Sequence, residues 1–268
     1  MKDVIVLKCG GSIMKNLTDR FFTNIKTLQK SGLKPIIVHG GGPEIKAMLD
    51  QLQIKTEFVN GLRKTTSEVM DVVEMVLSGT VNNELVRKLN KAGITSIGLS
   101  GSDANLFEAV PKDFKNLGYV GEMTRVNISF LFNLLDQGIV PVIAPIAVGK
   151  DGVRYNVNAD TVAGEVAKAV IAKQLIFVTD VPGIMKEGVL LDTVTEDEIK
   201  MFITNGIIHG GMIPKVEAAL LSLNDYLEEA MIVDGNQAVL ASNETTLVGT
   251  VIKKSTEVVD HVSNITNV

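Results

Sequence analysis

The sequence is poor in residue types on which several common classes of protein depend. Among its 268 residues are one cysteine, three histidines and no tryptophan. The single cysteine, Cys9, excludes a disulfide framework and any four-cysteine zinc site. His39, His209 and His261 lie far apart and show no metal-ligand spacing. The sequence therefore predicts no metal site built from protein side chains alone.

Long hydrophobic runs and an excess of positive charge are also missing. No apolar stretch approaches the roughly 20 residues that span a bilayer, and no signal or transit segment is recognisable. The 26 basic and 31 acidic side chains give a net charge of −5, which argues against a nucleic-acid protein or a basic membrane binder. Apolar residues make up 46% and charged residues 21%, as in globular proteins. We expect a cytoplasmic protein without nucleic-acid or membrane partners.

Short apolar runs alternate with longer amphipathic stretches along the chain. The runs are typical of buried strands, and the stretches carry apolar residues at helical spacing. Strands are expected at 4–7, 35–38, 94–99, 140–144, 175–179 and 231–234, and helices at 17–31, 44–53, 65–78, 82–91, 128–137, 161–173, 196–205 and 214–227. Residues 105–127 alternate more loosely and predict antiparallel hairpins. This order predicts the α/β class, with a sheet between layers of helices.

No linker rich in proline or serine divides the chain, so we expect a single domain over 1–268. Its internal division separates a lobe at 1–155 from a second lobe at 156–254, followed by a polar tail at 255–268. The P-loop, Rossmann and protein-kinase signatures are all absent, which argues against the usual nucleotide sites.

Two glycine loops stand at the predicted ends of the first two strands. Lys8 precedes Gly10-Gly11, and a cation beside exposed backbone N–H groups binds oxyanions, although an ordinary turn explains this loop alone better. The second loop, Gly40-Gly41-Gly42 before Pro43, is harder to explain as a plain turn, because three consecutive glycines cost considerable chain entropy. The helix that starts there favours a negative group. We expect His39 to be a structural hydrogen-bonding residue.

Polar side chains gather in two further segments. In an extended strand Asn156, Asn158 and Asp160 would share one face, whereas each also suits a helix cap. Lys215 lies in the first turn of a predicted helix, where the macrodipole disfavours a cation, so it either faces an anion or is simply exposed. Lysines, glycine loops and a carboxylate are what phosphoryl transfer requires. The residues alone thus predict an α/β anion-binding enzyme and leave open a kinase without a P-loop.

Six segments, in this order, carry a resemblance to a known family. They are Lys8-Cys9-Gly10-Gly11-Ser12, Val38-His39-Gly40-Gly41-Gly42-Pro43, Asn60-Gly61-Leu62-Arg63-Lys64-Thr65, Asn156-Val157-Asn158-Ala159-Asp160, Thr179-Asp180-Val181-Pro182-Gly183-Ile184 and Gly210-Gly211-Met212-Ile213-Pro214-Lys215. Over about residues 3–253 the chain resembles the amino-acid kinase superfamily, and most closely the acetylglutamate kinases. The resemblance implies a three-layer αβα sandwich with an open, mainly parallel central sheet.

The resemblance also implies an activity and roles for individual residues. The activity is ATP-dependent phosphorylation of the γ-carboxylate of N-acetyl-L-glutamate, the second step of arginine (ornithine) biosynthesis. The catalytic residues would be Lys8 and Lys215, which stabilise the transferring group, Asp160, which orients both lysines, and Gly11, which donates an N–H group. Gly41 would donate a second N–H group, and the acid would be bound by Gly41, Gly42, Arg63 and Asn156.

The second lobe would bind ATP, and the first would bind the acid and form a dimer contact. The nucleotide pocket would be lined by Thr179, Asp180, Val181, Pro182, Gly183, Ile184, Met185, Ile207, Ile208 and His209. Mg²⁺ would be carried on the nucleotide phosphates. Cys9 replaces a larger residue of many relatives and is expected to be inert.

Two alternatives stay open beside this reading. One is a kinase for a related acid such as acetylaminoadipate, because one methylene of the substrate is worth only about 1–3 kcal/mol of discrimination. A non-catalytic ligand-binding relative is the other, against which the retention of Lys8, Asp160 and Lys215 argues. We expect a homodimer that arginine does not inhibit, since only three residues precede Val4 and arginine-sensitive members carry an extra N-terminal helix. The segment 249–252, however, resembles the arginine-sensitive pattern.

Overall fold

An eight-stranded sheet forms the centre of the molecule. The computed structural model describes residues 3–224, 227–236 and 248–255. The strand order is β14-β16-β15-β11-β1-β2-β8-β5. The bounds are β1 Val4–Cys9, β2 Lys34–His39, β5 Ser96–Leu99, β8 Val140–Ile143, β11 Gln174–Thr179, β14 Thr193–Thr195, β15 Glu229–Asp234 and β16 Gly249–Lys253. Every neighbouring pair is parallel except β15 and β16, which confirms the predicted mainly parallel sheet.

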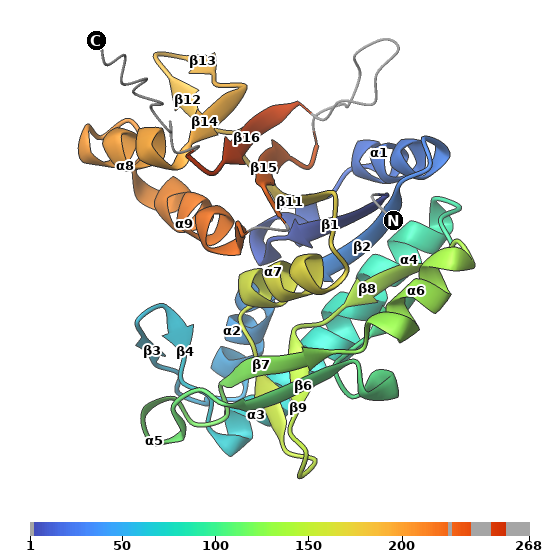
Figure 1. The fold of residues 1–268 in the computed structure, drawn as a ribbon. Helices are drawn as coiled ribbons and strands as arrows, with labels where there is room; N and C mark the ends of the chain where they lie inside the picture. The colour runs from blue at the N-terminus through green and yellow to red at the C-terminus, as the bar shows by residue number, and fades with distance from the viewer. Residues whose placement is uncertain (1–2, 225–226, 237–247, 256–268) are drawn as a thin grey trace, which may run out of the picture.

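Helices cover both faces of this sheet, and the alternation of side chains in β1 shows why. Val4 and Val6 point into one hydrophobic core, whereas Ile5 and Leu7 point into another. The first core contains α6 Ile128–Asp136, α7 Ala159–Ala169, α8 Glu196–Thr204 and α9 Ile213–Ser222, and the second contains α1 Asp19–Lys30, α2 Gly42–Gln51, α3 Ser67–Glu74 and α4 Asn82–Lys91. In Figure 1, α7 crosses the face of β1 and β2. The predicted three-layer αβα sandwich is confirmed.

A second, four-stranded sheet has the order β10-β9-β6-β7. Its strands are β6 Phe107–Pro111, β7 Gly121–Val126, β9 Ile146–Val148 and β10 Arg154–Asn156. The antiparallel pairing of β6 with β7 confirms the hairpin predicted at 105–127, which also contains the short helix α5, Phe114–Leu117. Two small hairpins, β3 Phe58–Val59 with β4 Leu62–Arg63 and β12 Met185–Lys186 with β13 Val189–Leu190, were not predicted, because strands of two residues have no readable periodicity.

Several predicted boundaries are wrong. The helix expected at 65–78 begins at Ser67 and continues through a π-helical turn, η2 Met75–Val81, directly into α4. The helix expected at 214–227 ends at Ser222, because Leu223 adopts an extended conformation. The helix expected at 161–173 begins at Ala159 and ends at Ala169. The short helical turns are η1 Gly11–Asn16, η3 Asp103–Asn105 and η4 Gly210–Met212.

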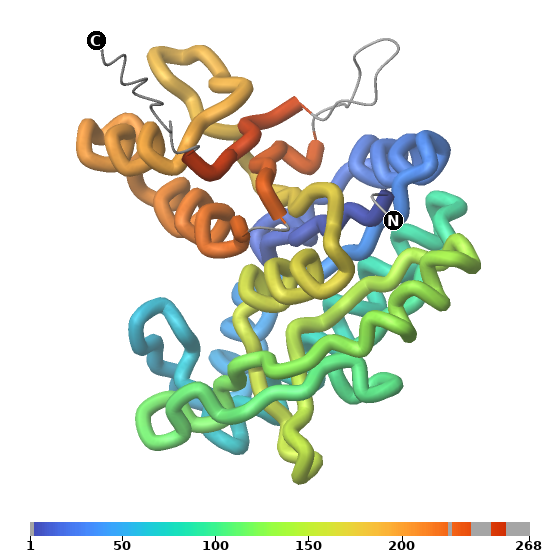
Figure 2. The backbone as a smooth tube through the Cα atoms, viewed as in Figure 1, coloured from blue at the N-terminus to red at the C-terminus, as the bar shows by residue number. Residues whose placement is uncertain are grey.

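Both halves of the chain share the central sheet. In Figure 2 the blue N-terminal strands lie between the green segments and the orange and red segments. Strand β2 lies beside β1 on one side, and β11, from the second half of the chain, pairs with β1 on the other side. Ligands of open α/β sheets bind at such a switch point, beyond the carboxyl ends of the strands. Within the described ranges, no helix is long and apolar enough to cross a membrane. The predicted polar tail lies outside the described residues apart from Ser255.

Candidate active site

The two predicted glycine loops lie against each other at the carboxyl ends of β1 and β2. A Cβ atom built on Gly11 would lie 2.9 Å from Pro43 Cδ and 3.0 Å from Gly42 N, and one on Gly41 would lie 2.6 Å from Leu77 Cδ2. A side chain is therefore excluded at Gly11, where the two loops meet. Neither Gly11 N–H nor Gly41 N–H donates a backbone hydrogen bond to another described residue. These N–H groups and the N-terminus of α2 are donors of the kind that bind an anion.

Lys8 projects from β1 beside these loops and forms an ion pair with Asp160. The Lys8 Nζ–Asp160 Oδ1 distance is 2.8 Å, and the side chains are 17% and 31% exposed. Asp160 lies in the first turn of α7, where the helix dipole favours a carboxylate. The structure thus places a cation, held by a helix-borne carboxylate, on the strand that leads into the first glycine loop.

The predicted shared face of Asn156, Asn158 and Asp160 is not found. The α7 helix begins at Ala159, so strand alternation stops before Asp160. Asn158 is the helix cap, and its Oδ1 accepts from the N–H groups of Asp160 and Thr161 at 2.8 and 3.2 Å. Asn156 remains in β10 and donates to the Thr65 hydroxyl. The three side chains therefore make different contacts: Asn156 bonds to Thr65, Asn158 caps α7, and Asp160 pairs with Lys8.

Lys215 lies in the first turn of α9 and pairs with Asp180 rather than with Asp160. The Lys215 Nζ–Asp180 Oδ1 distance is 3.1 Å, and the hydrogen bond from Lys215 lowers the pKa of the Asp180 carboxyl. Lys215 thus faces an anion, one of the two interpretations of its place at a helix start. The expected role of Asp160 in orienting both lysines stays a prediction, because in this structure Asp160 pairs with Lys8 and Lys215 pairs with Asp180. The reason is that Asp180 directly follows β11, within reach of the start of α9.

Arg63 is oriented by three contacts. Its Nη1 donates to the Thr56 hydroxyl at 3.0 Å, its Nη2 donates to the Gly42 carbonyl at 3.4 Å, and its guanidinium lies 4.7 Å from the ring centroid of Phe58. Phe58 is its direct cross-strand neighbour. Partial burial lowers the pKa of Arg63, and no carboxylate of the described residues forms an ion pair with it. A guanidinium that is held in place and forms no ion pair with a described carboxylate fits a ligand carboxylate.

His39 and Cys9 are structural residues, as expected. His39 is fully buried between the Gly40 carbonyl, 3.0 Å from Nδ1, and the Asn82 amide, 3.0 Å from Nε2. Burial lowers the pKa of His39 to about 4 and raises the pKa of Cys9 to about 12. The sequence reasoning missed Asn82, whose amide also donates to the Val142 carbonyl. A polar residue on the apolar face of a predicted helix was the available signal.

The predicted nucleotide segments lie beyond the carboxyl end of β11 and before α9. The side chains of Ile184 and Ile208 are only 1% and 2% exposed and belong to the core. Their side chains therefore pack in the core, and their place in a nucleotide pocket stays a prediction. Asp180, Met185 and His209 are exposed. The other candidates in these segments, Thr179, Val181, Pro182, Gly183 and Ile207, are buried or half-buried.

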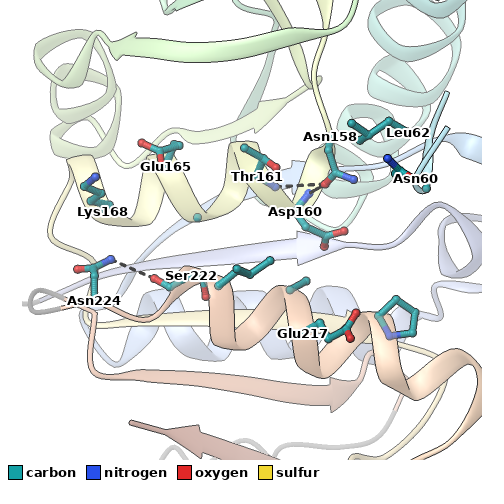
Figure 3. Close-up of a pocket in the computed structure, with 15 residues that line it drawn as sticks. Asn60, Leu62, Asn158, Asp160, Thr161, Glu165, Lys168, Glu217, Ser222 and Asn224 are labelled. Atoms are coloured by element: carbon teal, nitrogen blue, oxygen red, sulfur yellow. Dashed lines mark hydrogen bonds between the residues drawn. The ribbon is translucent and has the colours of Figure 1, made fainter. Parts of the chain in front are cut away.

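A pocket of about 580 Å³ opens next to the Lys8–Asp160 pair. Figure 3 shows it between α7 and α9, with Asp160 and Asn158 at one end and Lys168 and Asn224 at the other. The β3–β4 hairpin contributes Asn60, Gly61 and Leu62, which precede Arg63. The groove thus joins the α7 end of the site to the hairpin that carries Arg63. The described ranges contain no cluster of three or more His, Cys, Asp or Glu side chains able to hold a metal ion.

Comparison with known proteins decides the family. The family model described as "Amino acid kinase family" matches residues 3–234. The chain belongs to the amino acid kinase family. An acetylglutamate kinase of Halalkalibacterium halodurans is 54% identical over 254 residues, covering 95% of this chain and 97% of the relative. An acetylglutamate kinase of Bacillus subtilis is 50% identical over 259 residues, covering 97% and 100%.

Solved structures of the same fold agree with this assignment. A crystal structure from Streptococcus mutans has a TM-score of 0.82 at 33% identity and covers 94% of this chain and 99% of its own. An N-acetylglutamate synthase from Neisseria gonorrhoeae, complexed with coenzyme A and N-acetyl-glutamate, has a TM-score of 0.80 at 19% identity and covers 95% and 60%. The second similarity concerns the fold alone. The family resemblance seen in the sequence is thereby confirmed.

Proposed function

We propose that the protein transfers the γ-phosphoryl group of ATP to the γ-carboxylate of N-acetyl-L-glutamate, the second step of arginine biosynthesis. The observation that carries the proposal is the 54% identity with an acetylglutamate kinase over 95% of the chain. The geometry supports it independently, because Lys8 pairs with Asp160 at the end of β1, the Gly11 and Gly41 N–H groups bond to no described backbone carbonyl, and Arg63 forms no ion pair with a described carboxylate.

The chain's contribution to the reaction is electrostatic and positional. A carboxylate oxygen attacks the γ-phosphorus, a new O–P bond forms, and the bond between that phosphorus and the β,γ-bridging oxygen breaks with its electron pair leaving on ADP. Lys8 and the N–H groups of Gly11 and Gly41 would stabilise the charge on the moving group. Asp160 holds Lys8 in place. Lys215 would approach from the α9 side, exchanging its bond with Asp180 for a phosphate oxygen.

The two substrates would occupy the two sides of the switch point. Arg63 would bind the α-carboxylate of the acid, with Gly41, Gly42 and Asn156 completing that subsite. ATP would lie against Thr179–Met185 and Ile207–His209. Mg²⁺ would neutralise charge on the phosphates and would be carried by them, because the described residues offer no side-chain cluster for it.

We also propose that the protein works as a homodimer in the cytoplasm. Light scattering at several concentrations tests the assembly: a mass near 58 kDa, twice the 28.8 kDa of the chain, supports it, and a monomer or hexamer contradicts it.

The activity is tested by coupled ADP release over a panel of acids with Mg²⁺ and ATP. N-acetyl-L-glutamate should be the best substrate, and free glutamate should be far poorer because the acetyl group is missing. Preferred turnover of N-acetyl-aminoadipate would move the proposal to the longer acid. Turnover of no acid, by a folded protein, would favour a non-catalytic ligand-binding relative.

A further inference from the structure

Thr65 connects the two side chains that are proposed to bind the acid. Its hydroxyl donates to the Arg63 carbonyl at 2.8 Å and accepts from Asn156 Nδ2 at 3.1 Å. Thr65 is 0% exposed, so no water competes for these bonds. Residues 63 and 156 are far apart in the sequence and belong to different sheets. One buried hydroxyl therefore spans the two halves of the acid subsite.

The backbone around Thr65 is fixed on both sides. Thr65 N–H donates to the Leu117 carbonyl at 2.9 Å, and Tyr119 N–H donates to the Thr65 carbonyl at 2.7 Å. Gly118, which lies between Leu117 and Tyr119, has φ +65°, and a Cβ atom there would lie 2.3 Å from the carbonyl oxygen of Thr65. Asn156 N–H donates to the carbonyl of the same Tyr119 at 2.9 Å. The main chain thus brings positions 65 and 156 together, and the hydroxyl sets the direction of the Asn156 side chain.

We propose that Thr65 is a positioning residue for the carboxylic-acid substrate, acting through Asn156 and the backbone of Arg63. The inference rests on the proposed function, because it assigns those two residues to the acid. Within the described part of the chain the Asn156 side chain makes one hydrogen bond, to Thr65. Without that bond the amide is free to rotate, and a half-buried amide donor and a half-buried carbonyl lose their partner.

The test compares Thr65→Val with Thr65→Ser in steady-state kinetics. Valine keeps the shape and removes the hydroxyl, so the KM for N-acetyl-L-glutamate should rise roughly tenfold, with the KM for ATP unchanged. Serine keeps the hydroxyl and should restore a KM within about twofold of the parent. Should the valine variant fail to fold, the ratio of the KM values of Thr65→Ala and Thr65→Ser measures the contribution of the same hydroxyl group.

Thr250→Val is the matched control. Thr250 is equally buried, at 0% exposure, but its hydroxyl bonds to Ile184 and Leu191 in the other half of the chain. The Thr250→Val variant should be less stable than the parent but should have the same KM for the acid. Equal KM values in parent, Thr65→Val and Thr65→Ser would overturn the positioning role and leave the proposed function intact. A parent chain that turns over no N-acetyl-L-glutamate would overturn both.

Discussion

Replacing Lys8 by methionine removes one charge from the site and keeps most of the side-chain volume. In the parent, Lys8 lies 2.8 Å from Asp160 and is 17% exposed, so its ammonium is preorganised rather than mobile. Losing one such electrostatic donor lowers kcat about 10²- to 10³-fold, or roughly 3–4 kcal/mol. The stability cost is smaller, about 1–2 kcal/mol, because Asp160 is 31% exposed and lies in the first turn of α7.

The assay is coupled ADP release at saturating substrates, together with thermal unfolding. Lys200→Met is the matched control, because Lys200 pairs with Glu196 on the surface of α8 with 63% of its side chain exposed. That variant should keep the parent kcat and lose less than about 0.5 kcal/mol. A folded Lys8→Met protein with kcat within tenfold of the parent would refute the role of Lys8 in transfer.

Three further predictions follow from the geometry. Arg63→Lys keeps the positive charge but loses the two-pronged guanidinium that bonds to Thr56 and Gly42. Initial-rate kinetics should therefore show that the KM for the acid rises at least tenfold, with a smaller fall in kcat, and an effect on kcat alone would contradict the assignment. Burial lowers the pKa of His39 to about 4, so the folded state resists protonation of this side chain. The free energy of unfolding should therefore fall by up to about 3 kcal/mol as the pH is lowered from 6.5 to 4. Urea unfolding at several pH values should show a shallower pH dependence for His39→Gln. Burial raises the pKa of the Cys9 thiol to about 12, so iodoacetamide at pH 8 should label the chain only after unfolding, which mass spectrometry detects.

The strands at the centre of the sheet were predictable because they are buried on both faces. β1, β2, β8, β11 and β15 read as continuous apolar runs, since each face packs against a helical layer. The glycine loops were also visible, because close contact between Gly11 and the 41–43 loop leaves no room for side chains. The sequence therefore predicted the order of the layers and the edge of the sheet at which the glycine loops meet.

The contacts within the site were not predictable from local patterns. Whether Asn158 or Asp160 caps α7 depends on a helix start that shifted by two residues. The Thr65–Asn156 bond joins residues 91 positions apart, and nothing in either segment's periodicity indicates it. Resemblance to a family supplied roles for Arg63 and Asn156, but only the structure shows the hydroxyl that lies between them.

The two lysines differ in how firmly their carboxylate partners hold them, and the difference follows from burial. Lys8 and Asp160 are 17% and 31% exposed, on a central strand and a helix that crosses it. Lys215 is 29% exposed, but its partner Asp180 is 61% exposed, in a loop. Exposed ion pairs contribute little, about 0–1 kcal/mol, so exchanging Asp180 for a phosphate oxygen costs little. The Lys8–Asp160 pair is thus suited to hold a phosphoryl group from a fixed position, whereas the Lys215 side chain is suited to move from Asp180 to the phosphate.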